Sequence, residues 1–184
     1  FAELLEPTDS SGPLARFLDR RGEGMYHFTL VVDDVERETH RLRQKGVQVM
    51  EAAPLGEQRR AWLHPRSTLG VLIVIVDKDP LAERGLENTP PGGLINRISH
   101  IHHVVKDLDK AVAMYEAVWG LKPHQRHRNP DEGFQNAIIR IGSNYIGILS
   151  PLKPDNPLAK FIERRGDGLR SVCFAVDNID SAIA

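Results

Sequence analysis

The spacing of apolar residues repeats one layout twice along the chain. An apolar stretch of about eight residues ends in an Asp that can cap a following helix, and that helix ends at Gly46 or Gly120. Three short stretches with strand character follow each helix. They read VQVM, RRAWLHP and GVLIVIV in the first copy, and LKPHQRH, FQNAIIRIG and NYIGILS in the second. The pattern therefore predicts two β-α-β-β-β modules, over residues 25–76 and 97–150.

A second, longer repeat runs across these modules. PLARFLDRRGEG at 13–24 matches PLAKFIERRGDG at 157–168, an offset of 144 residues. At the same offset LLEP at 4–7 matches ILSP at 148–151, and LVVDDVE matches FAVDNID. A helix, a Gly-x-Gly turn, a strand and a second helix thus recur in order, which indicates duplicated units.

The segment between the modules, DKDPLAERGLENTPPGGL, is rich in Pro, Gly and charge and predicts a linker over 81–96. We expect residues 1–80 to be the C-terminal part of a first domain and 97–184 the N-terminal part of a second. The chain opens on the last strand of one module and stops in the first helix of another. The two whole modules therefore either belong to successive domains or pair with each other or with a second chain.

Charge and composition indicate which classes of binding partner to expect. The chain has 24 basic and 25 acidic residues without a strong block of either sign, which favours a small-molecule partner over nucleic acid or a membrane surface. No apolar run approaches the roughly 20 residues that cross a bilayer. The single cysteine, Cys173, excludes an intrachain disulfide and suits a reducing compartment. We expect a soluble, cytoplasmic protein.

Histidines concentrate on the first strand of the second module, in the sequence HIHH. Because side chains alternate along a strand, His100 and His102 share one face and His103 points to the other. Imidazole is the commonest transition-metal ligand, but a metal site needs three or four donors, and the others must come from elsewhere. The spacing of these histidines is compatible both with a metal site and with packing residues that form hydrogen bonds.

The βαβββ layout resembles the vicinal oxygen chelate superfamily, which includes glyoxalase I, methylmalonyl-CoA epimerases, extradiol dioxygenases and bleomycin-resistance proteins. The likeness to the epimerases is carried by ELLEPT at 3–8, PLARF at 13–17, GEGMYH at 22–27, VVDD at 31–34 and HPRSTLGVLIVIV at 64–76. The resemblance implies an α+β fold in which paired βαβββ modules, with curved mixed sheets, enclose a cavity that contains a metal.

The resemblance also implies metal ligands. In the N-terminal copy Glu3 takes the place of the family's Gln or Glu, and His27 that of its second His. Both are expected on strand centres, facing one cavity. The carboxylate expected on the last strand is replaced by Val74.

In the C-terminal copy His100 takes the place of the family's first His. Gly147 stands where Gln or Glu is expected, and Ser171 where the second His is expected. His102 lies on the same face as His100 and is available to replace the ligand lost at Ser171, while His103 is assigned to packing. If the two modules pair with each other, the resemblance places His27 beside His100, with His102 as a third donor.

Epimerisation next to a thioester carbonyl needs two bases, and neither Val74 nor Asn136, which occupy the family's base positions, accepts a proton. The nearest carboxylates lie in the turn NPDEG, and we assign the catalytic role to Glu132 on condition that this turn folds into the cavity. The loop HPRSTLG suits an acidic substrate group, with His64, Ser67 and Thr68 as substrate-binding residues, although tight turns favour the same residue types.

Three functions follow from the resemblance. The first is a metal-dependent isomerase or lyase of the epimerase or glyoxalase type, acting on a small acyl thioester or keto acid with Zn, Ni, Co, Mn or Fe as the divalent metal. The second is a metal-free small-molecule binding protein, and the third is an extradiol-type dioxygenase, which Val74 disfavours. Because a lone βαβββ sheet leaves an apolar face and strand edges open, we also expect a homodimer.

Overall fold

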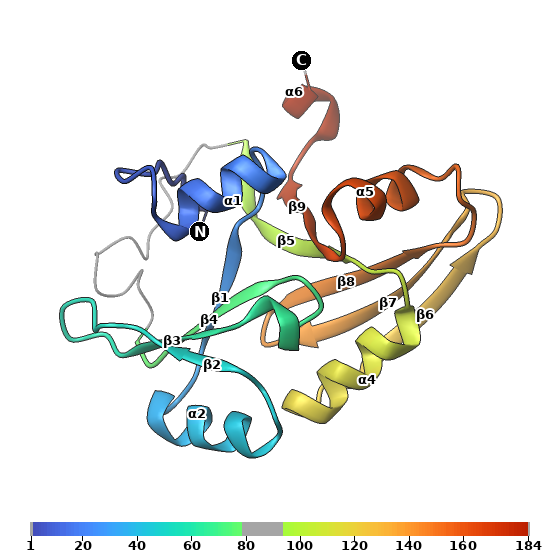
Figure 1. Cartoon of the computed structure of the whole chain (residues 1–184). Coiled ribbons are helices and arrows are strands. Elements are labelled where there is room, and N and C mark those ends of the chain that lie inside the picture. Colours follow the sequence, from blue (N-terminus) through green and yellow to red (C-terminus); the bar gives the residue numbers. More distant parts are fainter. Residues whose placement is uncertain (1, 79–93, 184) are drawn as a thin grey trace.

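The computed structural model describes residues 2–78 and 94–183. The first half contains α1 (Pro13–Arg21), β1 (His27–Val31), α2 (Val35–Gln44), β2 (Val49–Glu51), β3 (Arg60–Leu63), the short 3-10 helix η1 (Pro65–Ser67) and β4 (Leu72–Val76) (Figure 1). The second half contains β5 (Ile95–Val104), α4 (Leu108–Trp119), β6 (Pro123–Asn129), β7 (Phe134–Ile141), β8 (Asn144–Pro151), α5 (Pro157–Arg165), β9 (Gly168–Val176) and α6 (Ile179–Ile183).

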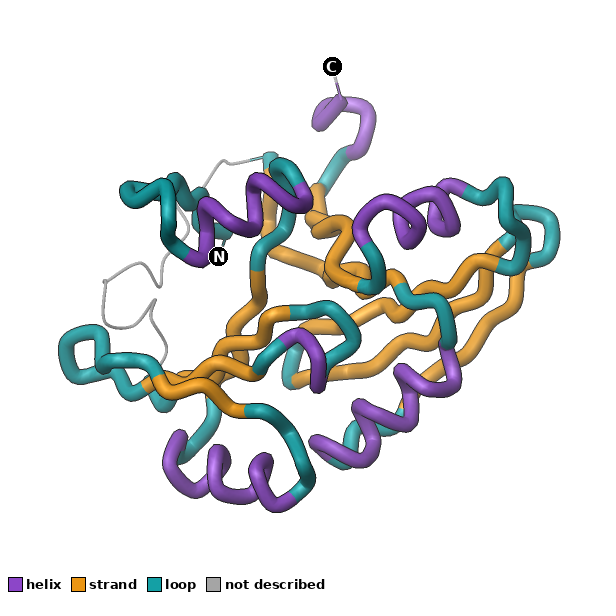
Figure 2. Tube along the Cα trace, in the orientation of Figure 1, coloured by secondary structure: helices purple, strands orange, loops and turns teal. Residues whose placement is uncertain are grey.

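Both predicted βαβββ modules are confirmed, and they share one strand order. The first sheet runs β1-β4-β3-β2 and the second β6-β7-β8-β5-β9. In each module the first strand lies parallel to the last, and the other pairs are antiparallel, so both sheets are mixed. The second sheet gains a fifth strand because β9 pairs antiparallel with β5. The two curved sheets stay separate and do not close into a barrel (Figure 2).

The helices begin where the sequence predicts. Asp34 and Asp107 precede α2 and α4, and their carboxylates accept the backbone N–H groups of Arg37 and Lys110. These bonds satisfy amides that the first helical turn leaves without a partner. At the other end of α4, Gly120 adopts a left-handed conformation that stops the helix.

Two apolar clusters form the core, and they are joined. One lies between α2 and strands β3 and β4, the other between α4 and strands β7 and β8. Phe28, Ile101, Met114 and Trp119 pack against both clusters. The two modules therefore contact each other through their helix-bearing faces.

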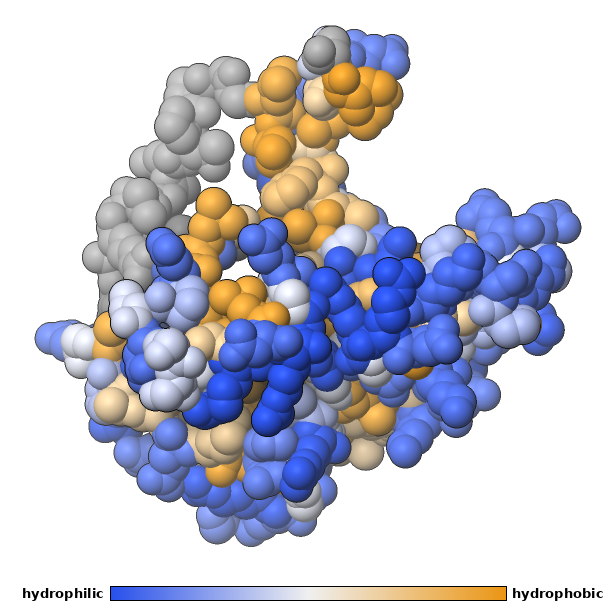
Figure 3. Space-filling model, turned by 45° about the horizontal axis from the view of Figure 1, so that its top comes forward, coloured by the Kyte–Doolittle hydropathy of each residue, from blue (hydrophilic) through white to orange (hydrophobic). Residues whose placement is uncertain are grey.

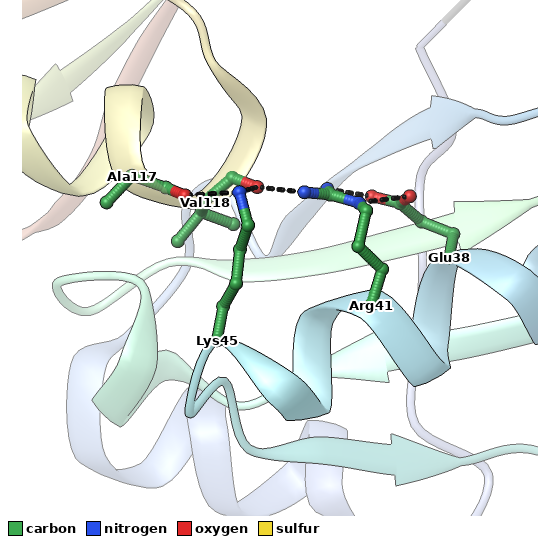
Figure 4. A network of polar contacts seen from close by, with 5 residues as sticks. All are labelled: Glu38, Arg41, Lys45, Ala117 and Val118. Atoms are coloured by element: carbon green, nitrogen blue, oxygen red, sulfur yellow. Dashed lines mark hydrogen bonds and ion pairs between the residues drawn. The ribbon is translucent and has the colours of Figure 1, made fainter.

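Polar contacts reinforce this junction at the C-terminus of α4 (Figure 4). Arg41 of α2, held by Glu38, donates to the carbonyl of Val118 at 2.7 Å, and Lys45 donates to that of Ala117 at 2.6 Å. These carbonyls lie at the negative end of the helix, where cations are favourable. One module thus caps the helix of the other.

The loop after β3 also reaches the second half. Leu69 has a positive φ of 50°, and its carbonyl accepts a hydrogen bond from His103 Nε2 at 2.9 Å. Gly70, at φ 83°, lies so close to the backbone of Asp167 that a Cβ at this position would overlap its carbonyl oxygen. Only glycine fits here.

Strand pairing decides which residues lie beside the histidines of β5. The strands next to β5 are β8 and β9, and β1 lies at the edge of the other sheet. Pairing therefore places Ser171 and Cys173, rather than His27, alongside His100 and His102.

The predicted linker at 81–96 lies mostly outside the described residues, and its last two residues belong to β5, which begins at Ile95. Within 2–78 and 94–183, none of the helices has the length and apolar character required to traverse a bilayer.

Candidate metal centre

Strand β5, which pairs with both β8 and β9, carries the site. Its register opposes His100 to Cys173, and His102 to both Gly147 and Ser171. Directly opposite residues in a sheet point to the same face. The neighbours Ile146 and Ile148 belong to the core beneath α4, so these five residues lie on the face turned away from that helix.

Three donor side chains converge on this face. His100 Nε2 lies 3.1 Å from His102 Nε2, and Cys173 Sγ lies 3.9 Å from His102 Nδ1. The donor atoms all lie within 4.8 Å of one another, and no other group of three His, Cys, Asp or Glu residues in the described part of the chain meets that condition. The prediction that His100 and His102 share a face is confirmed.

Serine hydroxyls orient both imidazoles. Ser99 Oγ lies 3.1 Å from Nδ1 of His100, and Ser171 Oγ lies 2.9 Å from Nδ1 of His102. When both Nδ1 atoms donate their hydrogens to the serine oxygens, both Nε2 atoms present lone pairs to a shared metal ion; in the other tautomers one Nε2 donates to the other across the 3.1 Å between them. Histidines that bind a metal usually donate their second N–H to an oxygen in this way.

The protonation states suit metal binding. Burial lowers the pKa of His100, and burial together with the charges of His100 and Arg170 lowers the pKa of His102 to about 4. Both rings are therefore neutral near pH 7, as ligation requires. Burial raises the pKa of the Cys173 thiol, so a metal has to displace its proton on binding.

The donor set fits a borderline metal. Two nitrogens bound at 2.0–2.1 Å in a tetrahedral site lie about 3.3 Å apart, close to the 3.1 Å between the two Nε2 atoms. Imidazole and thiolate together favour Zn, Co or Ni over Mg, which prefers oxygen ligands. The converging group contains no carboxylate.

Gly147 explains how His102 enters the site. A Cβ at Gly147 would lie 2.9 Å from His102 Cδ2. The ring of His102 thus fills the space that a Gln or Glu at position 147 would need, and it contacts Ser171, where the second His is expected. Gly147, His102 and Ser171 therefore fit together as one arrangement that differs from the expected ligand pattern.

The first half holds the remaining predicted ligands. His27 opens β1 and is half-buried; burial lowers its pKa, and the nearby charge of Glu3 opposes that shift. Glu3 is exposed and lies in no strand, so its predicted place on a strand centre is wrong. Neither residue belongs to the converging group of β5 and β9. A shared cavity for His27 and Glu3 stays a prediction.

His103 points to the opposite face, as predicted. It is fully buried, with Nδ1 3.1 Å from Tyr115 Oη and Nε2 bonded to the carbonyl of Leu69. Both ring nitrogens have partners within the core, which identifies His103 as a packing residue.

The two positions considered for proton transfer lie on β7 and in the turn that precedes it. Glu132 is exposed on the turn between β6 and β7, whose backbone is held by Asn129 and Asn156 at 3.1 and 2.8 Å. Asn136 lies opposite Leu149 on β8, and its Oδ1 is buried without a hydrogen-bond partner among the residues that the structure describes. An amide oxygen is not a base at neutral pH. The catalytic role of Glu132 stays a prediction.

The predicted substrate-binding residues hydrogen-bond within their own loop. His64 Nδ1 accepts from the amide of Arg66 at 3.1 Å, and Ser67 Oγ accepts from the amide of Gln48 at 2.9 Å. Thr68 is fully buried and donates to the carbonyl of Val71. These bonds shape the loop, and a role in substrate binding stays a prediction.

Sequence reasoning missed Cys173 and the two orienting serines. The only sequence signal for Cys173 was the repeat at an offset of 144 residues. It makes Cys173 equivalent to Thr29, and both lie on the first strand of a module, as His100 does.

A family model matches most of the chain. The model of the Glyoxalase/Bleomycin resistance protein/Dioxygenase superfamily covers residues 2–61 and 99–184. Human mitochondrial methylmalonyl-CoA epimerase is 30% identical over 90 residues, which are 48% of this chain and 51% of that protein. Ethylmalonyl-CoA/methylmalonyl-CoA epimerase of Cereibacter sphaeroides is 30% identical over 48% of this chain and 67% of its own length. The chain spans about half the length of the mammalian relatives it matches.

Among solved structures, methylmalonyl-CoA epimerase from Mycobacterium tuberculosis aligns with a TM-score of 0.48 and 25% identity, covering 51% of this chain and 64% of that one.

Proposed function

The chain belongs to the glyoxalase/bleomycin resistance/dioxygenase superfamily, and we propose that it is a metal-dependent isomerase or lyase that acts on a small acyl thioester or keto acid. The observation that carries the proposal is the convergence of His100, His102 and Cys173 on one sheet face. The epimerases among its relatives support the reaction type.

The proposed roles follow from the contacts. A bound Zn, Co or Ni ion would polarise the substrate carbonyl and stabilise the charge that develops when the α-proton leaves. His100 and His102 would hold it through Nε2, with Ser99 and Ser171 fixing their tautomers. Cys173 would supply a thiolate as third donor.

Proton transfer is assigned to the turn that precedes β7. Val74 and Asn136 occupy the two expected base positions and carry no basic group, so the role passes to the turn NPDEG, where we assign it to Glu132. It is exposed, and it acts only if a bound substrate reaches the turn.

Exchange of the α-proton tests the proposal directly. The chain, loaded with Zn or Co, is incubated in D₂O with methylmalonyl-CoA or propionyl-CoA, and loss of the α-proton signal is followed by NMR. We expect metal-dependent exchange that His100→Ala and Glu132→Gln abolish and that His40→Ala, at an exposed site on α2, leaves unchanged. Bound metal without exchange would contradict the enzyme and favour ligand binding without turnover, the alternative that the missing bases support.

We further propose that the chain forms a homodimer through β1. This strand lies at the edge of its sheet, and Val31 is 57% exposed. An uncharged, apolar edge such as HFTLV is prone to pair with another strand. Light scattering after gel filtration should give twice the chain mass, and Thr29→Pro should return the monomer.

A further inference from the structure

A second polar feature lies between α5 and β9. A shallow pocket there is lined by Pro157, Lys160, Phe161, Arg164, Arg165 and Arg170. Figure 3 shows strongly hydrophilic side chains gathered across the face to which α1 and α5 belong. Four of these six residues are cations, and none of the lining residues in ranges 2–78 and 94–183 is a carboxylate.

Among the described residues, these cations have no carboxylate counterion. Arg165 donates to the backbone carbonyl of Glu23, at 3.1 Å from both terminal nitrogens. Within the described residues Lys160, Arg164 and Arg170 make no ion pair or side-chain hydrogen bond, whereas other arginines of the chain, such as Arg59 and Arg126, pair with carboxylates. Like charges gathered without compensation repel each other, so this arrangement favours an external anion.

The internal repeat provides a comparison within the same molecule. Phe17 corresponds to Phe161 and Tyr26 to Arg170 at the offset of 144 residues. In the first copy the ring of Tyr26 packs edge-on against Phe17, with centroids 5.0 Å apart. In the second copy an arginine replaces the tyrosine, and Phe161 lines the pocket instead. The second copy therefore exchanges an aromatic packing contact for a positive charge.

The pocket adjoins the candidate metal centre. Arg170 directly precedes Ser171, whose Oγ lies 2.9 Å from His102 Nδ1. The pocket and the candidate metal centre therefore share strand β9.

We propose that this pocket binds a phosphate ester carrying at least two negative charges, and that the ester is the anionic end of the acyl thioester. Guanidinium groups bind phosphate oxygens in pairs of parallel hydrogen bonds, which makes several uncompensated arginines a better match for phosphate than for a single carboxylate. The second part rests on the proposed function; the first does not need the metal.

Calorimetric titration of chelator-treated protein with inorganic pyrophosphate tests the first part. We expect binding that weakens with salt, and a loss of about tenfold or more for Arg170→Tyr and for Arg164→Gln, the range of a charged hydrogen bond. Arg170→Tyr installs the residue found in the first copy, which the fold accommodates there. Arg43→Gln, which removes an equal charge from α2, should change the affinity by less than about twofold.

Two results would overturn the first part: no pyrophosphate binding, or equal binding by wild type and Arg170→Tyr. A separate binding experiment uses phosphatidic acid vesicles in place of pyrophosphate. Vesicle binding that Arg170→Tyr abolishes, without pyrophosphate binding, would replace the small ligand with a lipid surface.

The second part is tested by comparing an acyl-CoA with the matching acyl-pantetheine, which lacks the phosphates. Wild type should prefer the CoA ester, and Arg170→Tyr should reduce that preference about tenfold. An unchanged preference would overturn this assignment. If the proposed function is wrong but the pocket binds phosphate, the protein will bind pyrophosphate and will not catalyse proton exchange.

Discussion

The buried ring of His103 links stability to pH. Burial lowers its pKa to about 4, against about 6.5 for a free imidazole. Because the pKa of His103 is lower in the folded state than in the unfolded state, its contribution to the unfolding free energy is complete above pH 6.5. That contribution is lost as the pH falls toward 4. The shift corresponds to about 3 kcal/mol of unfolding free energy. Measured by urea unfolding with chelator at pH 7.5 and 4.5, the loss on acidification should be greater in the wild type than in a variant without this imidazole by an amount of that order.

His103→Asn serves as the control for this effect. The variant should be less stable at pH 7.5 and should lose less stability on acidification, because its side chain does not titrate. An equal pH dependence in both proteins would contradict the assignment.

The coupling between Gly147 and His102 gives a second prediction for single residues. Gly147→Gln places a Cβ against the His102 ring, and overpacking of this kind costs about 1–3 kcal/mol. His102→Ser should remove most of that cost in the double variant. Denaturant unfolding of the two single variants and the double variant measures the coupling, and simple additivity would contradict it.

Alternation along a strand was enough to predict the directions of His100, His102 and His103. Cys173 could not be found in the same way. Its place opposite His100 depends on the pairing of β5 with β9, which includes register shifts near Ile98 and His102. Such irregularities leave no local signal in the sequence, because the partner strand lies about 70 residues away along the chain.

At the level of elements, α4 depends on the other module for its C-terminal cap. Its last turn contains no basic residue, and Arg41 of α2 and Lys45, which directly follows α2, supply the charges. Replacing both with Met should lower the unfolding free energy by about 2 kcal/mol, since two charged hydrogen bonds are lost at a partly exposed site. Chemical denaturation measures this loss.

The comparison is Arg43→Met on the same helix, where an exposed pair with Glu51 is removed. That change should cost less than about 0.5 kcal/mol. Equal losses for the two variants would show that the cap on α4 contributes little.

The elements themselves were largely predictable because caps, glycine stops and periodicity agree in both modules. Glu3 is the exception. Residues 4–7 repeat the sequence pattern of 148–151, and the later segment ends β8 because β5 and β7 flank it. The earlier segment has no paired strand in the described part of the chain and stays irregular. A strand pattern forms a strand only where partners exist.

For the whole molecule, the contact between the two halves depends on Gly70. A Cβ at this position would overlap the carbonyl oxygen of Asp167, and φ is 83°. We expect Gly70→Ala to cost about 3 kcal/mol or more, because both the backbone and the packing between the halves must shift. Thermal unfolding should show a lower midpoint or two separate transitions.

Gly46→Ala is the matched control, with a φ of 78° and nothing within 4 Å of the added Cβ. It should cost only about 1 kcal/mol, from the backbone conformation alone. A similar loss for both variants would contradict the close approach as the cause.

For the molecule as a whole, the proposed function requires that His100, His102 and Cys173 bind one divalent metal ion per chain. Titration of chelator-treated protein with Co²⁺, followed by absorption spectroscopy, tests it most directly, because a thiolate ligand adds a charge-transfer band and tetrahedral coordination intensifies the visible bands. We expect one equivalent to bind, Cys173→Ser to lose the charge-transfer band, His102→Ala to lose most of the affinity, and His40→Ala to behave as wild type. Absence of the band in the wild type, or unchanged affinity in His102→Ala, would contradict the claim.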